Sequence, residues 1–330
     1  MSKKYVIGID GGGTKTAFLL ANMQGEVLSK VVKENSHYLT IGFEKLSQVI
    51  DMGIKECMQQ VKCTSDDIVY CAVCICGYGD VKQHDIQLEK AIQSALGNIA
   101  YGVYSDTYNA HRGSLVGFPG IHVIAGTGSI AFGINAKGDV LRCGGWNHLF
   151  GGDEGSAYWL ACKMLLEFTR QSDGRSPKSY LYSYLKDKYA LDDDGQIIDL
   201  TVLKYGFDRT KIADMAKDLF VIAKNGDMVA ARIYEEAAKE LALLITTIGQ
   251  KLNMNKPILV SYSGGVFNSG KYILDPLGDI LADVGYRLVK PRFDPSLGSL
   301  IVAYKAINSD IDKEMLSNFD RYQENKENNG

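Results

Sequence analysis

The chain has 330 residues, which is long enough for two modest domains with a substantial core. Its formal net charge of −3 argues against a general nucleic-acid binder, because such proteins usually carry a basic surface. There is no signal-peptide core after Ser2 and no apolar stretch long enough to span a bilayer. The sequence therefore predicts a cytoplasmic protein with neither nucleic acid nor membrane among its partners.

A glycine-rich segment lies close to the N-terminus, where residues 9–20 read IDGGGTKTAFLL. Such segments occur where a backbone must approach phosphate closely. The spacing fits neither familiar nucleotide loop. A Walker loop needs glycine directly before Lys15, where Thr14 stands, and a dinucleotide fingerprint needs glycine or alanine at Thr16. Both also need a helix next, whereas residues 17–32 read as two strands joined by a tight turn, so we predict a β-hairpin.

Seven cysteines are present, and five of them fall between Cys57 and Cys76. Helical spacing covers roughly residues 43–60, and the segment 69–76 that follows has the composition of a strand. On a strand, Cys71 and Cys74 would point to opposite faces, which suits a pair of metal ligands poorly. We interpret them as small hydrophobic residues of a buried core strand.

A short apolar strand at 103–105 ends on Asp106, after a helical pattern at 88–96. A carboxylate at the carboxyl end of a strand lies where α/β sheets usually bind ligands. Aspartate is also a good helix N-cap, and helix-forming sequence follows. From these residues alone both roles remain open.

The loop at the N-terminus occurs a second time. Residues 13–28 (GTKTAFLLANMQGEVL) and residues 126–141 (GTGSIAFGINAKGDVL) align without gaps at an offset of 113. Short hairpins can resemble one another by chance, since the turn pattern N-x-x-G is common, but six positions are identical in register and a seventh pairs the acids Glu26 and Asp139. We therefore predict a duplicated domain with two phosphate-facing hairpins.

Two further glycine elements follow the second hairpin. CGGWNH at 143–148 and GGDEGS at 151–156 combine glycines, acids and an indole, which is unusual for a purely structural connection. The sequence predicts a helix from 157 to about 170, largely helical structure over 176–253 and a strand at 258–262. SGGVFN at 263–268 then leads into a helix near 272–283, and a short polar helix forms the tail.

In this order, the segments IDGGGTKT, SD at 105–106, AGTGS, CGGW, GDEGS and SGGVFN resemble the N-acetylglucosamine kinase family. That family belongs to the BadF/BadG/BcrA/BcrD-type ATPases of the actin–hexokinase superfamily, and the resemblance spans residues 5–304. It implies an α/β fold of two duplicated ribonuclease H-like domains, with ATP and sugar in the interdomain cleft. The implied domains are a small one at 1–118 and a large one at 119–330, and it stays open whether the C-terminal helix packs back on the small domain.

The resemblance also implies an activity and roles for individual residues. The activity is transfer of the γ-phosphate of ATP to a hydroxyl, with the 6-OH favoured, of an amino sugar, with ATP and Mg²⁺ as cofactors and a homodimer as the assembly. Asp106 is the implied general base, and Asp10 orients the metal. The implied nucleotide-binding residues are Gly11, Gly12, Gly13, Thr14, Lys15, Thr127, Gly264 and Gly265. The implied sugar-binding residues are Asn35, Ser129, Gly145, Trp146, Asn147 and Asp153.

The sugar loop departs from the family pattern. Asn147 stands where the family has glycine, Gly151-Gly152 looks like an insertion, and Cys76 replaces a serine or alanine. The sugar therefore stays open among N-acetylglucosamine, glucosamine, N-acetylmuramate and glucose. Two alternatives from other classes are an ATPase that activates a CoA-ester dehydratase or reductase and a sugar sensor without catalysis.

Overall fold

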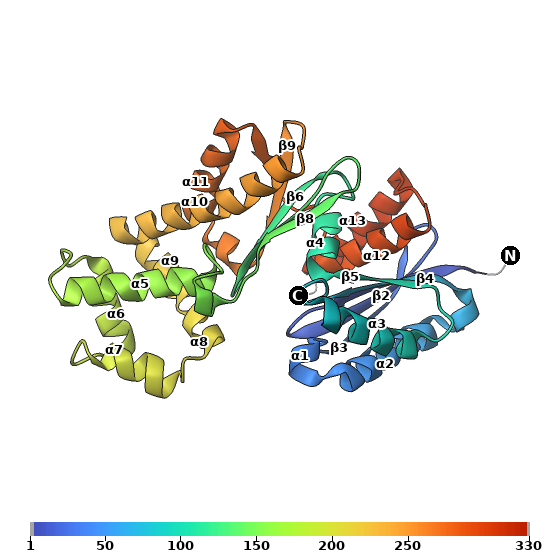
Figure 1. The fold of residues 1–330 in the computed structure, drawn as a ribbon, viewed down its shortest axis with the longest axis horizontal. Coiled ribbons are helices and arrows are strands. Elements are labelled where there is room, and N and C mark those ends of the chain that lie inside the picture. The colour runs from blue at the N-terminus through green and yellow to red at the C-terminus, as the bar shows by residue number, and fades with distance from the viewer. Residues whose placement is uncertain (1–2, 329–330) are drawn as a thin grey trace. The chain divides into compact units, whose positions relative to one another are not determined.

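The computed structural model describes residues 3–328, which fold into two compact units (Figure 1). The first unit combines the chain up to residue 118 with the chain from residue 290 onward, and the second holds residues 119–289. The sequence had assigned residues 290–330 to the second domain. Nowhere in residues 3–328 is a helix both long and apolar enough to cross a membrane.

The first unit is built on a five-stranded mixed sheet in the order β3-β2-β1-β4-β5. β1, β2 and β3 form an antiparallel meander, while β4 and β5 run parallel to β1. Its elements are β1 Tyr5–Gly11, β2 Lys15–Asn22, β3 Val27–Glu34, α1 Tyr38–Ile41, α2 Phe43–Val61, β4 Ile68–Ile75, α3 Lys82–Leu96, β5 Tyr101–Ser105, α4 Asp106–Ser114, α12 Pro295–Ala306 and α13 Lys313–Asn328.

Helices cover both faces of this sheet (Figure 1). Side chains alternate along each strand, so Ile7 packs in the core beneath α2 and α3, whereas Val6 packs in the core beneath α12. Cys71 belongs to the first of these cores and Cys74 to the second, and both are fully buried. The prediction that the two cysteines point to opposite faces is confirmed, and all seven cysteines are free.

Close backbone contacts explain why α12 belongs to the first unit. A Cβ atom at Gly298 would lie 2.0 Å from the carbonyl oxygen of Asn109, so α12 can approach α4 this closely only with glycine there. Likewise, a Cβ at Gly8 in β1 would lie 2.3 Å from the hydroxyl of Ser299. α13 adds Phe319 to the same core, where its ring packs edge-on against Phe293.

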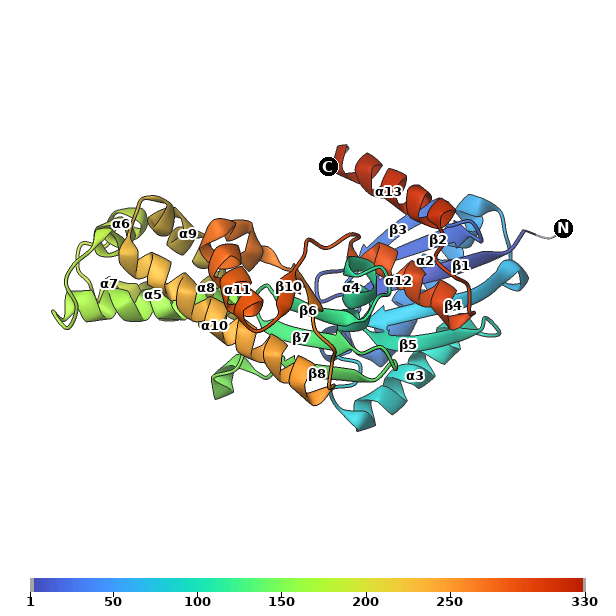
Figure 2. The same cartoon turned by 90° about the horizontal axis from the view of Figure 1, so that it is seen from above.

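The second unit repeats the topology of the first. Its sheet order is β10-β9-β6-β7-β8, in which β6, β7 and β8 form the meander and β9 and β10 are the parallel strands. Figure 2 shows α10 running along β7 and β8. Its elements are β6 Gly120–Ala125, β7 Ser129–Ile134, β8 Val140–Gly144, α5 Ala157–Ser172, α6 Tyr180–Tyr189, α7 Gln196–Ile198, a π-helical segment Asp199–Lys204, α8 Arg209–Asp214, α9 Ala216–Lys224, α10 Met228–Lys251, β9 Ile258–Ser263, α11 Lys271–Asp283 and β10 Tyr286–Leu288.

The second turn of each meander has the same hydrogen bonds. This agreement confirms the duplication predicted from the sequence. Asn22 Oδ1 accepts from the backbone N–H groups of Gln24 and Glu26, each at 3.0 Å. Asn135 Oδ1 accepts from the equivalent N–H groups, 113 residues further on, each at 2.9 Å. Gly25 and Gly138 follow in the left-handed conformation, with φ of 81° and 87°. The repeated N-x-x-G pattern is therefore the signature of one turn used twice.

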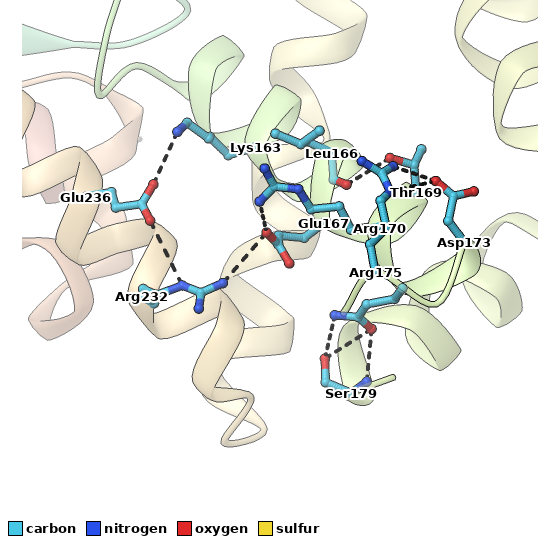
Figure 3. Close-up of polar contacts among 11 residues, drawn as sticks. Lys163, Leu166, Glu167, Thr169, Arg170, Asp173, Arg175, Ser179, Arg232 and Glu236 are labelled. Atoms are coloured by element: carbon cyan, nitrogen blue, oxygen red, sulfur yellow. Dashed lines mark hydrogen bonds and ion pairs between the residues drawn. The ribbon is translucent and has the colours of Figure 1, made fainter. Parts of the chain in front are cut away.

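A polar network fastens α5 to α10 on the surface of the second unit (Figure 3). The carboxylate of Glu167 accepts from Arg170 at 2.8 Å and pairs with Arg232 of α10 at 3.7 Å. One turn earlier on α5, Lys163 donates to Glu236 at 3.2 Å. These contacts join helix surfaces whose apolar faces already pack in the core of the unit.

Candidate active site

The first glycine loop connects β1 to β2, as predicted, and is exposed from Gly13 to Lys15. Gly11 pairs with Thr16 across the hairpin, and the N–H of Gly12 donates to the carbonyl of Lys15 at 3.1 Å. A short four-residue loop with exposed amides and a hydroxyl at Thr14 therefore projects from the sheet. Such backbone concavities bind anions without a helix N-terminus.

Asp10 precedes the last residue of β1, and helix α4 holds its carboxylate. Asn109 Nδ2 donates to Asp10 Oδ1 at 2.9 Å and to the carbonyl of Pro295 at 2.8 Å. Because both partners are acceptors, Asn109 Oδ1 faces elsewhere, and this buried atom has no hydrogen-bond partner among the described residues. The pKa of Asp10 is raised to about 6, mainly by burial; the Asn109 hydrogen bond lowers this pKa, and the charges of Asp106 and Asp294 raise it.

Asp106 is the first residue of α4 and follows β5 directly. The N-cap of this helix is Ser105, whose Oγ accepts from the N–H of Tyr108 at 3.3 Å, so the capping alternative for Asp106 is wrong. The thiol of Cys76 and the N–H of Thr107 stabilise the ionised Asp106 carboxylate and so lower its pKa. Burial raises the pKa of Asp106 by more than these donors lower it.

The strand directions of the first unit bring these residues to one edge of the sheet. β1, β3, β4 and β5 all run the same way, so the residues that follow them share the carboxyl edge. Asp10 and the glycine loop, Asn35 after β3, Cys76 after β4 and Asp106 after β5 all lie there. The N–H of Cys76 also donates to the carbonyl of Gly11 at 2.9 Å. Ligands of α/β sheets bind at this edge.

Ser36 is a residue of this edge that sequence reasoning missed. Its N–H donates to the carbonyl of Gly12 at 3.3 Å, and a Cβ at Gly11 would lie 2.4 Å from its hydroxyl. The hydroxyl is buried and has no hydrogen-bond partner among the described residues. Its neighbour Asn35 uses its side-chain oxygen to accept from the N–H of His37 at 3.3 Å. Nothing in the residue pattern marks Ser36, because the contact depends on how β3 ends beside the loop.

The second glycine loop, residues 126–128, connects β6 to β7 and is one residue shorter than the first. Ala125 pairs with Ser129 across it, and the N–H of Gly126 donates to the carbonyl of Gly128 at 2.9 Å. Because of the missing residue, Ile124 occupies the strand position that Asp10 has in the first hairpin. The two hairpins are alike in shape, but only the first carries a carboxylate at this strand position.

Asp153 and Ser129 support this second loop. Asp153 Oδ1 accepts from the N–H of Ser129 at 3.1 Å, and Asp153 Oδ2 accepts from Arg209 Nη2 at 2.6 Å. Ser129 Oγ donates to the carbonyl of Glu154 at 2.6 Å. Asp153 is buried and has φ of 64°, a left-handed conformation that costs a non-glycine residue energy. Both carboxylate oxygens of Asp153 are thus engaged within the second unit.

The loop after β8 presents Trp146 to solvent, with 67% of the side chain exposed. Gly145 precedes it in the left-handed conformation with φ of 72°. Asn147 Oδ1 accepts from the N–H of Leu149 at 2.9 Å and so caps a single turn at 148–150. A Cβ at Gly152 would lie 2.8 Å from the carbonyl oxygen of Trp146, so the inserted glycines let the loop close on itself.

A pocket of about 430 Å³ lies in the second unit. Thr127 of the glycine loop and Gly265 after β9 both line it, whereas Gly264 turns the chain with φ of 105° against the end of β6. The residue pattern does not mark the walls formed by α8 and α9, because the whole of residues 176–253 reads as largely helical. The remaining lining residues are Gly126, Ala157, Leu160, Thr210, Ala213, Asp214, Ala216, Lys217, Phe220, Tyr234, Val266, Asn268 and Ser269.

The arrangement is similar to that of known proteins. Residues 7–303 match the BadF/BadG/BcrA/BcrD ATPase family. Over 305 residues, 91% of this chain and 98% of the relative, the sequence is 30% identical to the N-acetylmuramic acid/N-acetylglucosamine kinase of Clostridium acetobutylicum. It is 29% identical to the N-acetyl-D-glucosamine kinase of Dictyostelium discoideum over 92% of this chain and 98% of that one.

A solved structure shares the fold. A protein of Chromobacterium violaceum assigned as an N-acetylglucosamine kinase superposes with a TM-score of 0.69 at 24% identity, covering 92% of this chain and 99% of that one. The predicted fold class, two duplicated sheets flanked by helices as in the actin–hexokinase group, is therefore confirmed.

Proposed function

The chain belongs to the BadF/BadG/BcrA/BcrD ATPase family, and we propose that it transfers the γ-phosphate of ATP to a hydroxyl group of an amino sugar. The proposed acceptor is the 6-OH of N-acetylglucosamine or of a relative such as N-acetylmuramate or glucosamine. The observation that carries the proposal is the meeting of two carboxylates, Asp10 and Asp106, with a glycine loop at one sheet edge. The names of the relatives support a kinase over an activator of CoA-ester enzymes or a sugar sensor.

Backbone amides and hydroxyls do most of the phosphate binding in this proposal. The backbone of residues 11–14, which is exposed at Gly13 and Thr14, holds the β- and γ-phosphates in the first unit, with Lys15 beside it. In the second unit Thr127 contacts phosphate, and the 430 Å³ pocket beside it takes the adenosine against Gly265. In phosphoryl transfer the protein mainly positions the reacting groups and neutralises charge. The backbone amides, hydroxyls and carboxylates of this site can do both.

The residues around Asp10 fit a bound Mg²⁺. The Asp10 carboxylate is enclosed with the like charges of Asp106 and Asp294 nearby, and Lys326 opposes them. Oδ1 of Asn109, whose Nδ2 donates to Asp10, is buried and has no hydrogen-bond partner among the described residues. Asp10 would hold the ion, directly or through water, and Asn109 Oδ1 could accept from such a water. When bound, Mg²⁺ neutralises charge on the phosphates and orients them.

Asp106 acts as the general base. Its carboxylate takes the proton of the sugar hydroxyl while that oxygen attacks the γ-phosphorus. Burial raises the pKa of Asp106 although the Cys76 thiol and the Thr107 N–H lower it, and the raised pKa makes the carboxylate a stronger base than a solvated aspartate. Because the basic form is the ionised one, the acid limb of the rate profile lies at higher pH than for an ordinary aspartate.

The family resemblance assigns sugar-binding residues in each unit separately. Asn35 supplies an amide in the first unit, and Ser129, Gly145, Trp146 and Asn147 supply a hydroxyl, backbone, an apolar ring and an amide in the second. An exposed indole beside polar groups is a common platform for one face of a sugar ring. Asp153 completes the set assigned by family resemblance, although its oxygens already bind Ser129 and Arg209.

A screen of acceptors tests the function. We expect Mg²⁺-dependent release of ADP from ATP that rises at least tenfold with one of N-acetylglucosamine, glucosamine or N-acetylmuramate over glucose and over no sugar. A coupled assay run over a dozen hexoses and amino sugars measures it, and phosphorus NMR of the product identifies the hydroxyl. A rate of ADP release that is the same with and without every sugar would contradict the assignment as a sugar kinase.

Trp146 gives a binding signal that is independent of turnover. We expect saturating sugar to change the tryptophan emission of a Trp159→Phe variant, in which Trp146 is the single indole. Trp159 is removed because it is the second of the two tryptophans and would add its own emission. The Trp146→Phe variant is the matched control and should show no sugar response. An unchanged emission together with full activity of Trp146→Phe would take that indole out of the sugar site.

Two finer expectations come from the family resemblance. The chain is proposed to act in the cytoplasm, where ATP and free sugar would both be available. It is proposed to form a homodimer. Light scattering of the purified protein measures the assembly, and a mass near the 36.2 kDa of one chain would contradict the dimer.

A further inference from the structure

Arg209 is a cationic residue beside the second glycine loop to which no role has been assigned. It opens α8, and its Nη2 donates to Asp153 Oδ2 at 2.6 Å. A Cβ placed on Gly128 would lie 2.5 Å from this same Nη2 and 2.5 Å from Asp153 Oδ1. The guanidinium and the carboxylate therefore press directly against the backbone of the loop.

The contact continues into the backbone of the hairpin. Asp153 Oδ1 accepts from the N–H of Ser129, the first residue of β7, at 3.1 Å. The chain Arg209–Asp153–Ser129 thus connects a helix to the end of the loop through two charge-assisted hydrogen bonds. The Asp153 side chain is only 6% exposed, so without Arg209 its charge would be buried and unpaired.

The guanidinium of Arg209 is partly buried, unlike that of an ordinary surface arginine. Its Nε is buried and has no hydrogen-bond partner among the described residues, although its side chain is 37% exposed as a whole. The donor is therefore available to an acceptor at this place. In an ion pair on the protein surface, the arginine Nε would be exposed to water.

The same helix continues into the wall of the nucleotide pocket. Thr210 and Ala213, one and four residues after Arg209, line the 430 Å³ pocket together with Thr127 of the loop. The loop, the ion pair and the pocket are all parts of the second unit. Arg209 consequently lies at the end of the pocket where Gly126 and Thr127 are found.

We propose that Arg209 is a positioning residue which, through Asp153, sets the geometry of loop 126–128 for binding the phosphates of the nucleotide. The inference rests on the proposed kinase function and deepens it. It assigns Asp153 to support of the phosphate-binding loop, whereas the family resemblance places this residue in the sugar site. Loss of the guanidinium frees the loop and leaves a buried charge beside the phosphates. Adenosine, which has no phosphate, is unaffected by either change.

The test compares ligands with different numbers of phosphates. Isothermal titration of adenosine, ADP and ATP, with Mg²⁺ present, is carried out on the wild type, Arg209→Met and Arg209→Lys. We expect Arg209→Met to weaken ADP and ATP about ten- to a hundredfold while adenosine affinity stays within twofold. Arg209→Lys keeps the charge and should recover part of the loss. Arg232→Met, which removes an exposed arginine of α10 paired with Glu167, is the matched control and should match the wild type.

Each other outcome has a definite meaning. Equal weakening of adenosine and ATP would overturn the proposal, since Arg209 would then only support the pocket, and so would unchanged affinity for all three. A wild type that binds no nucleotide would contradict the kinase function itself. If Arg209→Met fails to fold, the double variant Arg209→Met with Asp153→Asn removes the unpaired charge, and the same phosphate-dependent loss is expected from it.

Discussion

Asp106→Asn is expected to lower kcat by about 10²- to 10⁴-fold while the affinities for ATP and sugar stay within a few fold. The substitution keeps the size of the side chain but removes the base that accepts the hydroxyl proton. The helix should survive, because Ser105 and not Asp106 is its N-cap. Steady-state kinetics measure kcat, and titration calorimetry measures both affinities.

The matched control is Asp310→Asn, the same chemical change at a side chain of the same unit that is 99% exposed. It should leave kcat unchanged. If Asp106→Asn keeps near-normal kcat while Asp153→Asn is inactive, the general base is Asp153. Because Asp153 contacts Ser129 and forms an ion pair with Arg209, we expect Asp153→Asn to weaken ATP binding more than it lowers kcat.

Asp10→Asn should reduce Mg²⁺-dependent turnover by about 10²-fold or more, since the loss of one metal-holding carboxylate costs about 3 kcal/mol of transition-state stabilisation. The Mg²⁺ concentration for half-maximal rate should rise, and calorimetric sugar binding should persist. The asparagine oxygen can still accept from Asn109, so the link to α4 is kept. Loss of sugar affinity with an unchanged response to Mg²⁺ would reverse the assigned role.

The same substitution makes a prediction about stability that needs no ligand. The pKa of Asp10 rises from 3.8 to about 6 on folding, mainly through burial, so the folded state binds the proton more tightly than the unfolded chain. Stability is therefore lost as pH rises through this window, by up to about 3 kcal/mol above it. Asparagine does not ionise and avoids this loss.

We accordingly expect ligand-free Asp10→Asn to melt several degrees above the wild type at pH 7.5 and at about the same temperature at pH 4. Differential scanning calorimetry at the two pH values measures it, with Asp310→Asn as the control. A melting difference independent of pH would mean that Asp10 is not a strained charge in the free protein. A difference found at pH 7.5 but not at pH 4 would make this position an example of stability given up for a functional charge.

The sequence by itself determined the local elements and their duplication. Strand alternation placed Cys71 and Cys74 on opposite faces, and the structure puts them in different cores. The repeated asparagine and glycine specified the same turn twice, because an Asx hydrogen-bond pattern and a left-handed glycine are properties of a few adjacent residues. Strand-like sequence after each glycine loop, where a nucleotide loop would have a helix, correctly indicated hairpins at Gly11 and Gly126.

Only the tertiary structure decided which elements pack together. α12 is buried nearly all round, so it has no apolar stripe that would indicate which sheet it covers, and close contacts at Gly8 and Gly298 assign it to the first unit. The candidate site likewise contains residues that the sequence could identify and residues that only the structure could. Asp10 and Asp106 could be named because each ends a recognisable strand. Their partners could not, because Asn109 binds Asp10 across 99 residues and Arg209 binds Asp153 across 56. Local patterns carry no information about such distant contacts, which exist only once helices have packed on their sheets.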